Sequence, residues 1–298
     1  MLTMTQKGII MSESKIKTVA VLGAGLMGTG IAQVVATGGY DVCLKDVSQD
    51  ILDRSKAEID KRLNRLIAKE KMTHEMAAEV LARITFTVDM KTALKSADFI
   101  IEAVPEDLAL KKKVFTEIDS VAKPSAIFAS NTSELSITSL AEATSKKEKV
   151  IGTHWFFPPQ VMKLIEVVVT PGTSQETVQE TLNFCETIGK ETVTCKDMQG
   201  FITSRAISAL VAECLRVYED GIASIEDIDK AMRLGFNHPI GPFQLVDMSG
   251  LDVVYHSLEE LSKKYGDRFK PTKTMSKLVQ EGNLGQKTGK GFYDYKPR

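Results

Sequence analysis

The stretch Thr18–Asp46, TVAVLGAGLMGTGIAQVVATGGYDVCLKD, decides the fold of this chain. An apolar run leads into glycines spaced as GxGxxG, an amphipathic segment follows, and a second apolar run ends at an acid. In such a turn Gly23 permits the tight bend, Gly25 lets the backbone approach a pyrophosphate, and Gly28 allows close helix–strand packing. The order of strand, glycine turn, helix and strand therefore predicts a dinucleotide-binding βαβ unit.

The acid that ends the second run indicates which dinucleotide binds. Asp46 stands about 20 residues after the glycine turn, where an acid accepts hydrogen bonds from the adenosine ribose and repels a 2′-phosphate. NAD is therefore expected rather than NADP, although Lys45 beside it keeps NADP open, and a ligand-free packing turn is the structural alternative. The residues expected to contact the cofactor here are Gly23, Gly25, Leu26, Met27, Gly28 and Asp46.

Composition narrows the class of protein. Of 298 residues, 43% are hydrophobic and 26% charged, with a net charge of −1, which is typical of a globular chain and argues against nucleic-acid or membrane binding through bulk charge. No apolar run is long enough to span a membrane.

The four cysteines form no CxxC pair and no cluster with histidine, so we expect a reduced, cytoplasmic protein without a metal site. Residues 1–15 lack a signal-peptide core and are expected to be a disordered leader.

Up to residue 196, apolar runs alternate with amphipathic segments, which predicts a doubly wound Rossmann-type α/β sheet over residues 16–196. Near-continuous apolar runs are typical of strands buried on both faces of a parallel sheet. We expect strands in TVAVLG, DVCLKD, FIIEAV, AIFAS, KVIGT, KLIEVVV and ETVTC. Residues about 50–84 have helical spacing and predict an inserted helical hairpin, whose second helix is capped by Thr73 and includes Ile84.

The pattern changes at residue 197. Apolar residues at helical spacing replace the β-branched runs, so residues 197–298 are predicted to form an all-α domain. Within it Ser224 is expected to cap a helix that Gly235 ends, and a further helix is expected in GLDVVYHSLEELSKKYG.

A candidate for proton transfer stands in HWFFPP, directly after the run KVIGT. His154 follows a strand, where open α/β sheets place their sites, and histidine is the usual general base near neutral pH. The remaining histidines, His74, His238 and His256, stand in the polar hairpin, before a proline and in an amphipathic helix. Glu166 interrupts the apolar run KLIEVVV, where an unpaired charge is costly, so we expect it to pair with an imidazole or another cation. A core histidine and a solvated strand-end acid remain the alternatives.

Several longer motifs are specific: GAGLMGTGIAQ, ASNTSELSIT, VMKLIEV, GIASIEDIDKAMRLG, HPIGPFQLVDMSGLD and GQKTGKGFYDY. From about Lys17 to Tyr295 the chain resembles the L-3-hydroxyacyl-CoA dehydrogenases, in particular the short bacterial 3-hydroxybutyryl-CoA dehydrogenases. The resemblance implies NAD-dependent oxidation of a (3S)-3-hydroxyacyl-CoA to the 3-ketoacyl-CoA, and the reverse. It implies that His154 is the general base, that Glu166 orients it, and that Ser133 holds the substrate oxygen.

The resemblance also implies contacts to cofactor and substrate. Glu106 is expected beside the nicotinamide, unless it only supplies charge to a helix N-terminus, and Asn131 is expected to contact the cofactor. Acyl-CoA is expected near the basic middle of the hairpin, with Lys69 and Arg62 as the CoA contacts, although a solvated helix face is the alternative. The helical domain is expected to contribute to substrate binding and to form a homodimer.

Three residues depart from the family pattern. Phe157 stands where the family loop H-F-F-N-P has asparagine, Ser204 replaces the asparagine of G-F-I-V-N-R, and Glu134 replaces a serine. Ser204 is expected in the site, where a hydroxyl replaces an amide. Three hypotheses follow: an acyl-CoA dehydrogenase with an altered pocket, a dehydrogenase of this fold for a hydroxy acid without CoA, or an NAD-binding protein that has lost turnover.

Overall fold

The computed structural model describes residues 15–295, so the predicted leader lies outside the described residues apart from Lys15. The chain divides into two compact units between Asp197 and Met198, and each is described by itself. No helix of residues 15–295 combines the length and the apolar character that crossing a membrane requires.

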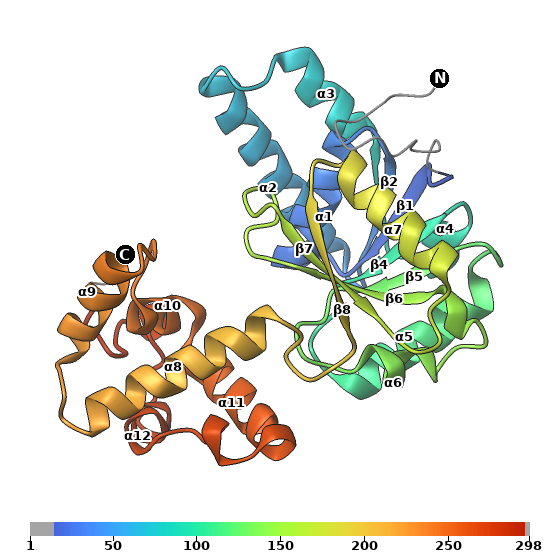
Figure 1. The fold of residues 1–298 in the computed structure, drawn as a ribbon. Helices are drawn as coiled ribbons and strands as arrows, with labels where there is room; N and C mark the ends of the chain where they lie inside the picture. Colours follow the sequence, from blue (N-terminus) through green and yellow to red (C-terminus); the bar gives the residue numbers. More distant parts are fainter. Residues whose placement is uncertain (1–14, 296–298) are drawn as a thin grey trace, which may run out of the picture. The chain divides into compact units, whose positions relative to one another are not determined.

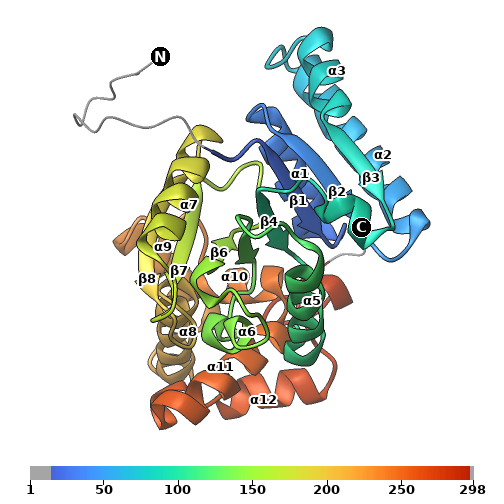
Figure 2. The same cartoon turned by 90° about the vertical axis from the view of Figure 1, so that its right-hand side faces the viewer.

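The first unit is built on one eight-stranded sheet in the order β3-β2-β1-β4-β5-β6-β7-β8 (Figures 1 and 2). All neighbouring strands are parallel except β6 and β7. The strands are β1 (Thr18–Leu22), β2 (Asp41–Lys45), β3 (Ile84–Thr87), β4 (Phe99–Glu102), β5 (Ile127–Ser130), β6 (Val150–Trp155), β7 (Leu164–Val169) and β8 (Glu191–Lys196). The prediction of a doubly wound Rossmann-type sheet is confirmed.

Two details of that prediction are wrong. Ile84 begins strand β3 instead of ending a helix, and it pairs with Val42 of β2. Strands β6 and β7 are antiparallel, so the sheet is not parallel throughout. Strand β8, predicted in ETVTC, is confirmed; it lies at the sheet edge and is mostly exposed.

Helices cover both faces of the sheet. In sequence order they are α1 (Leu26–Thr37), α2 (Gln49–Ala68), α3 (His74–Ala82), α4 (Met90–Leu94), α5 (Leu108–Val121), α6 (Ile137–Ala141), the 3₁₀ turn η1 (Lys147–Lys149) and α7 (Gln175–Thr187). Helices α2 and α3 form the predicted hairpin between β2 and β3 (Figure 1). Thr73 caps α3 as predicted, since its hydroxyl accepts a hydrogen bond from the Met76 amide at 3.2 Å.

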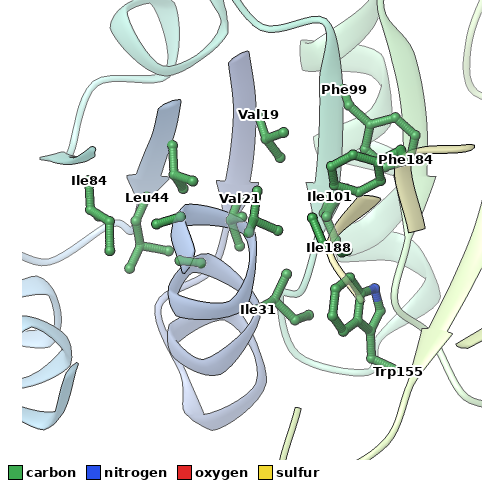
Figure 3. Close-up of a cluster of buried hydrophobic side chains, with 14 of the residues drawn as sticks. Val19, Val21, Ile31, Leu44, Ile84, Phe99, Ile101, Trp155, Phe184 and Ile188 are labelled. Carbon is green, nitrogen blue, oxygen red and sulfur yellow. The ribbon is translucent and has the colours of Figure 1, made fainter. Parts of the chain in front are cut away.

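The main core of this unit lies between the sheet and helices α1 and α7 (Figure 3). Phe99 of β4 stacks on Phe184 of α7 at 4.7 Å between ring centroids. Trp155, only 3% exposed, joins this cluster beside Ile31 of α1. Because side chains alternate along a strand, Trp155 in the core directs His154 to the other face of β6.

The second unit is all-helical, as predicted. Its helices are α8 (Thr203–Glu219), α9 (Ile225–Gly235), α10 (Pro242–Ser249), α11 (Leu251–Tyr265) and α12 (Lys273–Gln280), with 3₁₀ turns η2 (Asp267–Phe269) and η3 (Gln286–Thr288). Ser224 caps α9 by accepting from the Asp227 amide at 3.1 Å. Helix α9 ends at Gly235, as predicted, and the positive φ of 56° that follows the helix belongs to Asn237.

Two buried aspartates explain the motifs of the second unit. Asp229 accepts from the amides of Phe243 and Gln244 at the start of α10, at 2.8 and 3.1 Å. Asp247 accepts from the amides of Phe292 and Tyr293, both at 2.9 Å, and thereby fastens the GKGFYDY segment to α10. These motifs therefore serve the packing of the helical unit.

Candidate active site

The glycine turn lies at the carboxyl end of β1. A side chain at Gly28 would place its Cβ 1.7 Å from the carbonyl oxygen of Gly23, so Gly28 is required by helix–strand packing. Gly23 has a φ of +102° and equally admits no side chain. A Cβ at Gly25 would meet no atom within 4 Å, so the space there is open to a ligand. Helix α1 starts after Gly25 without a side-chain cap, which leaves its first amides available to a phosphate.

Asp46 supports this turn directly. One carboxylate oxygen accepts from the amide of Ala24 inside the turn at 2.7 Å, and the other accepts from the amide of Val47 at 2.7 Å. A carboxylate offers about four acceptor positions, so further hydrogen bonds to ribose hydroxyls are possible. Leu26 and Val47 flank the turn with 69% and 83% of their surface exposed, while Met27 packs partly against the core. The residues present fit a dinucleotide.

His154 and Glu166 lie directly opposite each other in the antiparallel pair of β6 and β7. Nδ1 of His154 is 2.6 Å from a carboxylate oxygen of Glu166, and the two residues are 6% and 0% exposed. The ring of Phe156 lies 4.5 Å from the imidazole, between centroids. Burial together with the Glu166 carboxylate raises the pKa of Cys195 on β8 to about 11, so this neighbour stays a neutral thiol. The structure thus brings together the pair that the sequence predicted, and the alternative of a solvated acid at position 166 does not hold.

Behind the carboxyl ends of β4 and β5 lies an ion pair that sequence reasoning missed. Lys111 of α5 is 1% exposed, and its ammonium donates to the fully buried Glu102 at 2.6 Å. Glu102 also accepts from the hydroxyl of Ser130 at 2.6 Å and from the amide of Val104 at 2.8 Å. The contact joins the ends of two strands to a helix. Lys111 gives no sequence signal, because a lysine in an amphipathic helix usually lies on the surface.

Glu106 extends this network toward Ser133. Its carboxylate lies 3.2 Å from the Lys111 ammonium and accepts from the hydroxyl of Thr132 and from the amide of Ser133, the latter at 3.2 Å. Asp107 supplies the cap of α5 by accepting from its third amide at 2.7 Å. Glu106 is therefore no mere helix-terminal charge, since it fixes the backbone that carries Ser133.

Asn131 ties the same loop to β6. Its side-chain oxygen accepts from the amide of Trp155 at 3.1 Å, next to His154. The backbone amide of Asn131 donates to the backbone carbonyl of Glu102 at 2.8 Å. The loop after β5 is thus held to both β4 and β6. It lies at the carboxyl ends of the strands, as the glycine turn does.

The two predicted CoA contacts lie on α2. Lys69 is exposed at the C-terminus of this helix, and Arg62 is half-buried two turns earlier. Nε of Arg62 lies 2.9 Å from Glu58, while its Nη1 is buried without a hydrogen-bond partner among residues 15–295. Such an orphan donor is costly unless a ligand satisfies it, which makes Arg62 more than a solvated helix face.

The departures from the family pattern fall in different places. Phe157 lies in the loop between β6 and β7 and is 59% exposed. Glu134 is half-buried after β5, and Ser204 is the second residue of α8 in the helical unit. Of the other histidines, His74 starts α3, His238 follows α9 and His256 is exposed on α11. Within the described part of the chain, no three His, Cys, Asp or Glu side chains are grouped so that they could hold a metal ion.

Hydride transfer to a nicotinamide requires a proton acceptor near the dinucleotide. In a Rossmann-type sheet such groups lie at the carboxyl ends of the strands. Here the glycine turn follows β1, and His154, paired with Glu166, lies at the carboxyl end of β6. The class of protein that follows is an NAD-dependent dehydrogenase.

The comparisons with known proteins name the family. Residues 18–198 match the model of the 3-hydroxyacyl-CoA dehydrogenase NAD-binding domain, and residues 200–295 match that of the 3-hydroxyacyl-CoA dehydrogenase C-terminal domain. The chain therefore belongs to the 3-hydroxyacyl-CoA dehydrogenase family, and NAD is its cofactor.

Sequence similarity to individual relatives extends over almost the whole chain. The mitochondrial hydroxyacyl-coenzyme A dehydrogenase of Rattus norvegicus is 43% identical over 289 residues, which cover 94% of this chain and 92% of the relative. The 3-hydroxybutyryl-CoA dehydrogenase of Clostridioides difficile is 42% identical over 277 residues, covering 93% and 98%. The crystal structure of (S)-3-hydroxybutyryl-CoA dehydrogenase from Ralstonia eutropha has a TM-score of 0.93 at 40% identity and covers 95% of this chain and 100% of its own.

Proposed function

We propose that the chain catalyses NAD-dependent oxidation of a short-chain (3S)-3-hydroxyacyl-CoA, such as 3-hydroxybutyryl-CoA, and the reverse reduction. The activity on 3-hydroxyacyl-CoA follows from the family. The short acyl group rests on the relatives named for 3-hydroxybutyryl-CoA. The observation that carries the proposal is the buried pair of His154 and Glu166 at 2.6 Å.

In this proposal Glu166 accepts the Nδ1–H of His154 and fixes the imidazole tautomer, so proton exchange with the substrate hydroxyl takes place at Nε2. When bound, NAD⁺ would supply the acceptor for the hydride that leaves C3 of the substrate during oxidation. His154 takes the hydroxyl proton, and the Glu166 carboxylate stabilises the imidazolium that forms. In the reverse direction the imidazolium returns the proton to the developing alkoxide.

Ser133 is proposed to donate a hydrogen bond to the substrate oxygen. Its backbone is held by Glu106, which in turn is held by the buried Lys111, so the hydroxyl is presented from a fixed loop. Ser204 is proposed to contribute a second donor in place of the family amide. Asp46 and the glycine turn are proposed to hold the dinucleotide, with Glu106 and Asn131 near its nicotinamide end. Lys69 and Arg62 are proposed to contact the CoA phosphates.

We propose that the chain is a homodimer. The helical unit exposes large apolar side chains on and near α9, α10 and α11, among them Leu234, Phe236 and Val253 at 74%, 71% and 57%. Apolar groups of this size at the surface favour association. A cytoplasmic location is proposed because all four cysteines are unpaired thiols. Mass determination in solution tests the dimer.

One assay tests the activity. Purified protein with NADH and acetoacetyl-CoA is expected to lose NADH absorbance, and His154→Gln is expected to reduce the rate by several orders of magnitude. Longer 3-ketoacyl-CoA thioesters and free acetoacetate, assayed side by side, test the acyl length and the need for CoA. Bound NADH without turnover of any thioester would contradict the proposal. A mild effect of His154→Gln would exclude His154 as the base.

A further inference from the structure

Lys190, between α7 and β8, is a buried cation that the reaction proposed above does not use. It is 8% exposed, and burial lowers its pKa. Its ammonium donates to the carbonyl oxygens of Pro159 at 2.5 Å and of Met162 at 2.7 Å. Both acceptors belong to residues 156–163, the loop that connects β6 to β7. A buried lysine with two carbonyl acceptors from one loop fixes that loop at two points.

The same loop is held from the opposite side by α1. A Cβ at Gly30 would come within 3.0 Å of Pro159 and 2.8 Å of the Gln160 side-chain amide, so the loop packs closely against the helix and a side chain at position 30 would push it away. The side-chain amide of Gln160 also donates to the buried Gln33 of α1 at 3.2 Å. Helix α1 is the helix whose N-terminus follows the glycine turn. The loop is therefore clamped between the dinucleotide helix and Lys190.

The clamped loop reaches the imidazole through Phe156, while Lys190 also contacts Trp155 on the core side of β6. Phe156, the first residue of the loop, packs its ring 4.5 Å from that of His154. The Lys190 ammonium lies 5.5 Å from the ring centroid of Trp155, within the range of a cation–π contact. Figure 3 shows Trp155 in the core beside Ile31 of α1 and Ile188, two residues before Lys190. A displacement of the loop would therefore move the ring that covers one side of His154.

We propose that Lys190 is a positioning residue for the dehydrogenase reaction: with Gly30 and Gln160 it clamps the 156–163 loop against α1 and so keeps Phe156 packed on His154. The inference rests on the proposed function, because it assigns His154 the proton transfer. Small misplacements at a reacting centre reduce kcat strongly. Lys190 is buried and is not among the residues proposed to bind substrate or cofactor, so we expect its replacement to leave the KM values almost unchanged.

The test compares Lys190→Met with Lys163→Met. Methionine keeps the aliphatic stem of Lys190 and removes both hydrogen bonds, while Lys163 is an exposed lysine of the same loop and serves as control. We expect Lys190→Met to reduce kcat with acetoacetyl-CoA about tenfold or more, with both KM values within about threefold of wild type. The emission of Trp155, the single tryptophan of the chain, is expected to shift in Lys190→Met and not in the control. An unchanged kcat in folded Lys190→Met protein would overturn the proposal, even if its Tm falls.

Gly30→Ala displaces the loop from the other side and keeps the proposal testable if Lys190→Met does not fold. We expect the same selective loss of kcat, and a Lys190→Met/Gly30→Ala double variant is expected to lose less than the product of the two single losses, because both act on one loop. Full multiplicativity would argue against a shared clamp. Hydrogen exchange of the Val161 and Met162 amides, which both bond to the Pro158 carbonyl, is expected to accelerate in either variant. Exchange needs no turnover, so it tests the clamp even if the wild type proves inactive and the proposed function fails.

Discussion

Replacing Glu166 by glutamine removes the charge behind His154 while keeping the shape of the side chain. The glutamine carbonyl can still accept from Nδ1, so the loss is the attraction between carboxylate and imidazolium. Two unit charges about 4 Å apart attract by about 4 kcal/mol at the effective dielectric constant of protein sites. Because the retained neutral hydrogen bond offsets about 1 kcal/mol, we expect a net loss of about 3 kcal/mol. Only the transition state carries the imidazolium during oxidation, so kcat should fall about a hundredfold.

The assay is NADH formation from (S)-3-hydroxybutyryl-CoA at saturating NAD⁺, with NADH affinity measured separately by fluorescence. Affinity should remain at the wild-type value, since Glu166 is buried behind the histidine and touches no cofactor position proposed here. Glu191→Gln is the control, because Glu191 starts the neighbouring strand β8 and is exposed. A loss of less than about fivefold in folded Glu166→Gln protein, or an equal loss in the control, would refute the assigned role.

Three further outcomes are expected. Gly25→Ala should fold with a Tm close to wild type and weaken NADH binding about tenfold or more, as seen by fluorescence titration, whereas Gly28→Ala should fail to fold because its Cβ would lie 1.7 Å from a backbone oxygen. Lys111→Met should reduce the free energy of unfolding by about 3–5 kcal/mol in urea titrations, since it leaves a buried carboxylate without its cation. Ser204→Asn should raise kcat/KM for acetoacetyl-CoA severalfold, and an unchanged value would place Ser204 outside the site.

The sequence predicts this fold well where one signal dominates. The strands of the first unit stand out because apolar, mostly β-branched runs are bounded by glycine or charged residues. The sequence pattern places Ile84 in the wrong element because this residue continues the four-residue spacing from Val80, so the helical pattern runs into strand β3. The β signal there is only the alternation of Ile84 and Phe86 with threonines. Over four residues the helical and the strand periodicity fit equally well, and only the pairing with β2 shows that the segment is a strand.

Some residues of the candidate site can be predicted from the sequence and others cannot. Asp46 and His154 follow apolar runs, so the rule that sites lie at the carboxyl ends of parallel strands finds them. Lys111 and Lys190 carry no such signal, because each is one lysine among many in a charged chain. Their burial depends on acceptors 9 and 31 residues away, Glu102 and Pro159, which only the folded sheet brings to them. Buried lysines such as these are thus harder to predict than Asp46 and His154.

The antiparallel pairing of β6 and β7 in the sheet explains how two residues twelve positions apart can form the proposed catalytic pair. If the strand after β6 were parallel to it, a long crossover would have to connect the two strands. A residue facing position 154 would then lie much further along the chain. Reversal of the chain after Trp155 instead lays β7 beside β6 in a register where position 154 faces position 166. The loop that connects the two strands contains Phe157, where the family pattern has asparagine. Gly30 and Lys190 contact other residues of this loop, and these contacts do not depend on the side chain at position 157. We therefore expect substitutions at position 157 to change substrate contacts while His154 stays in place.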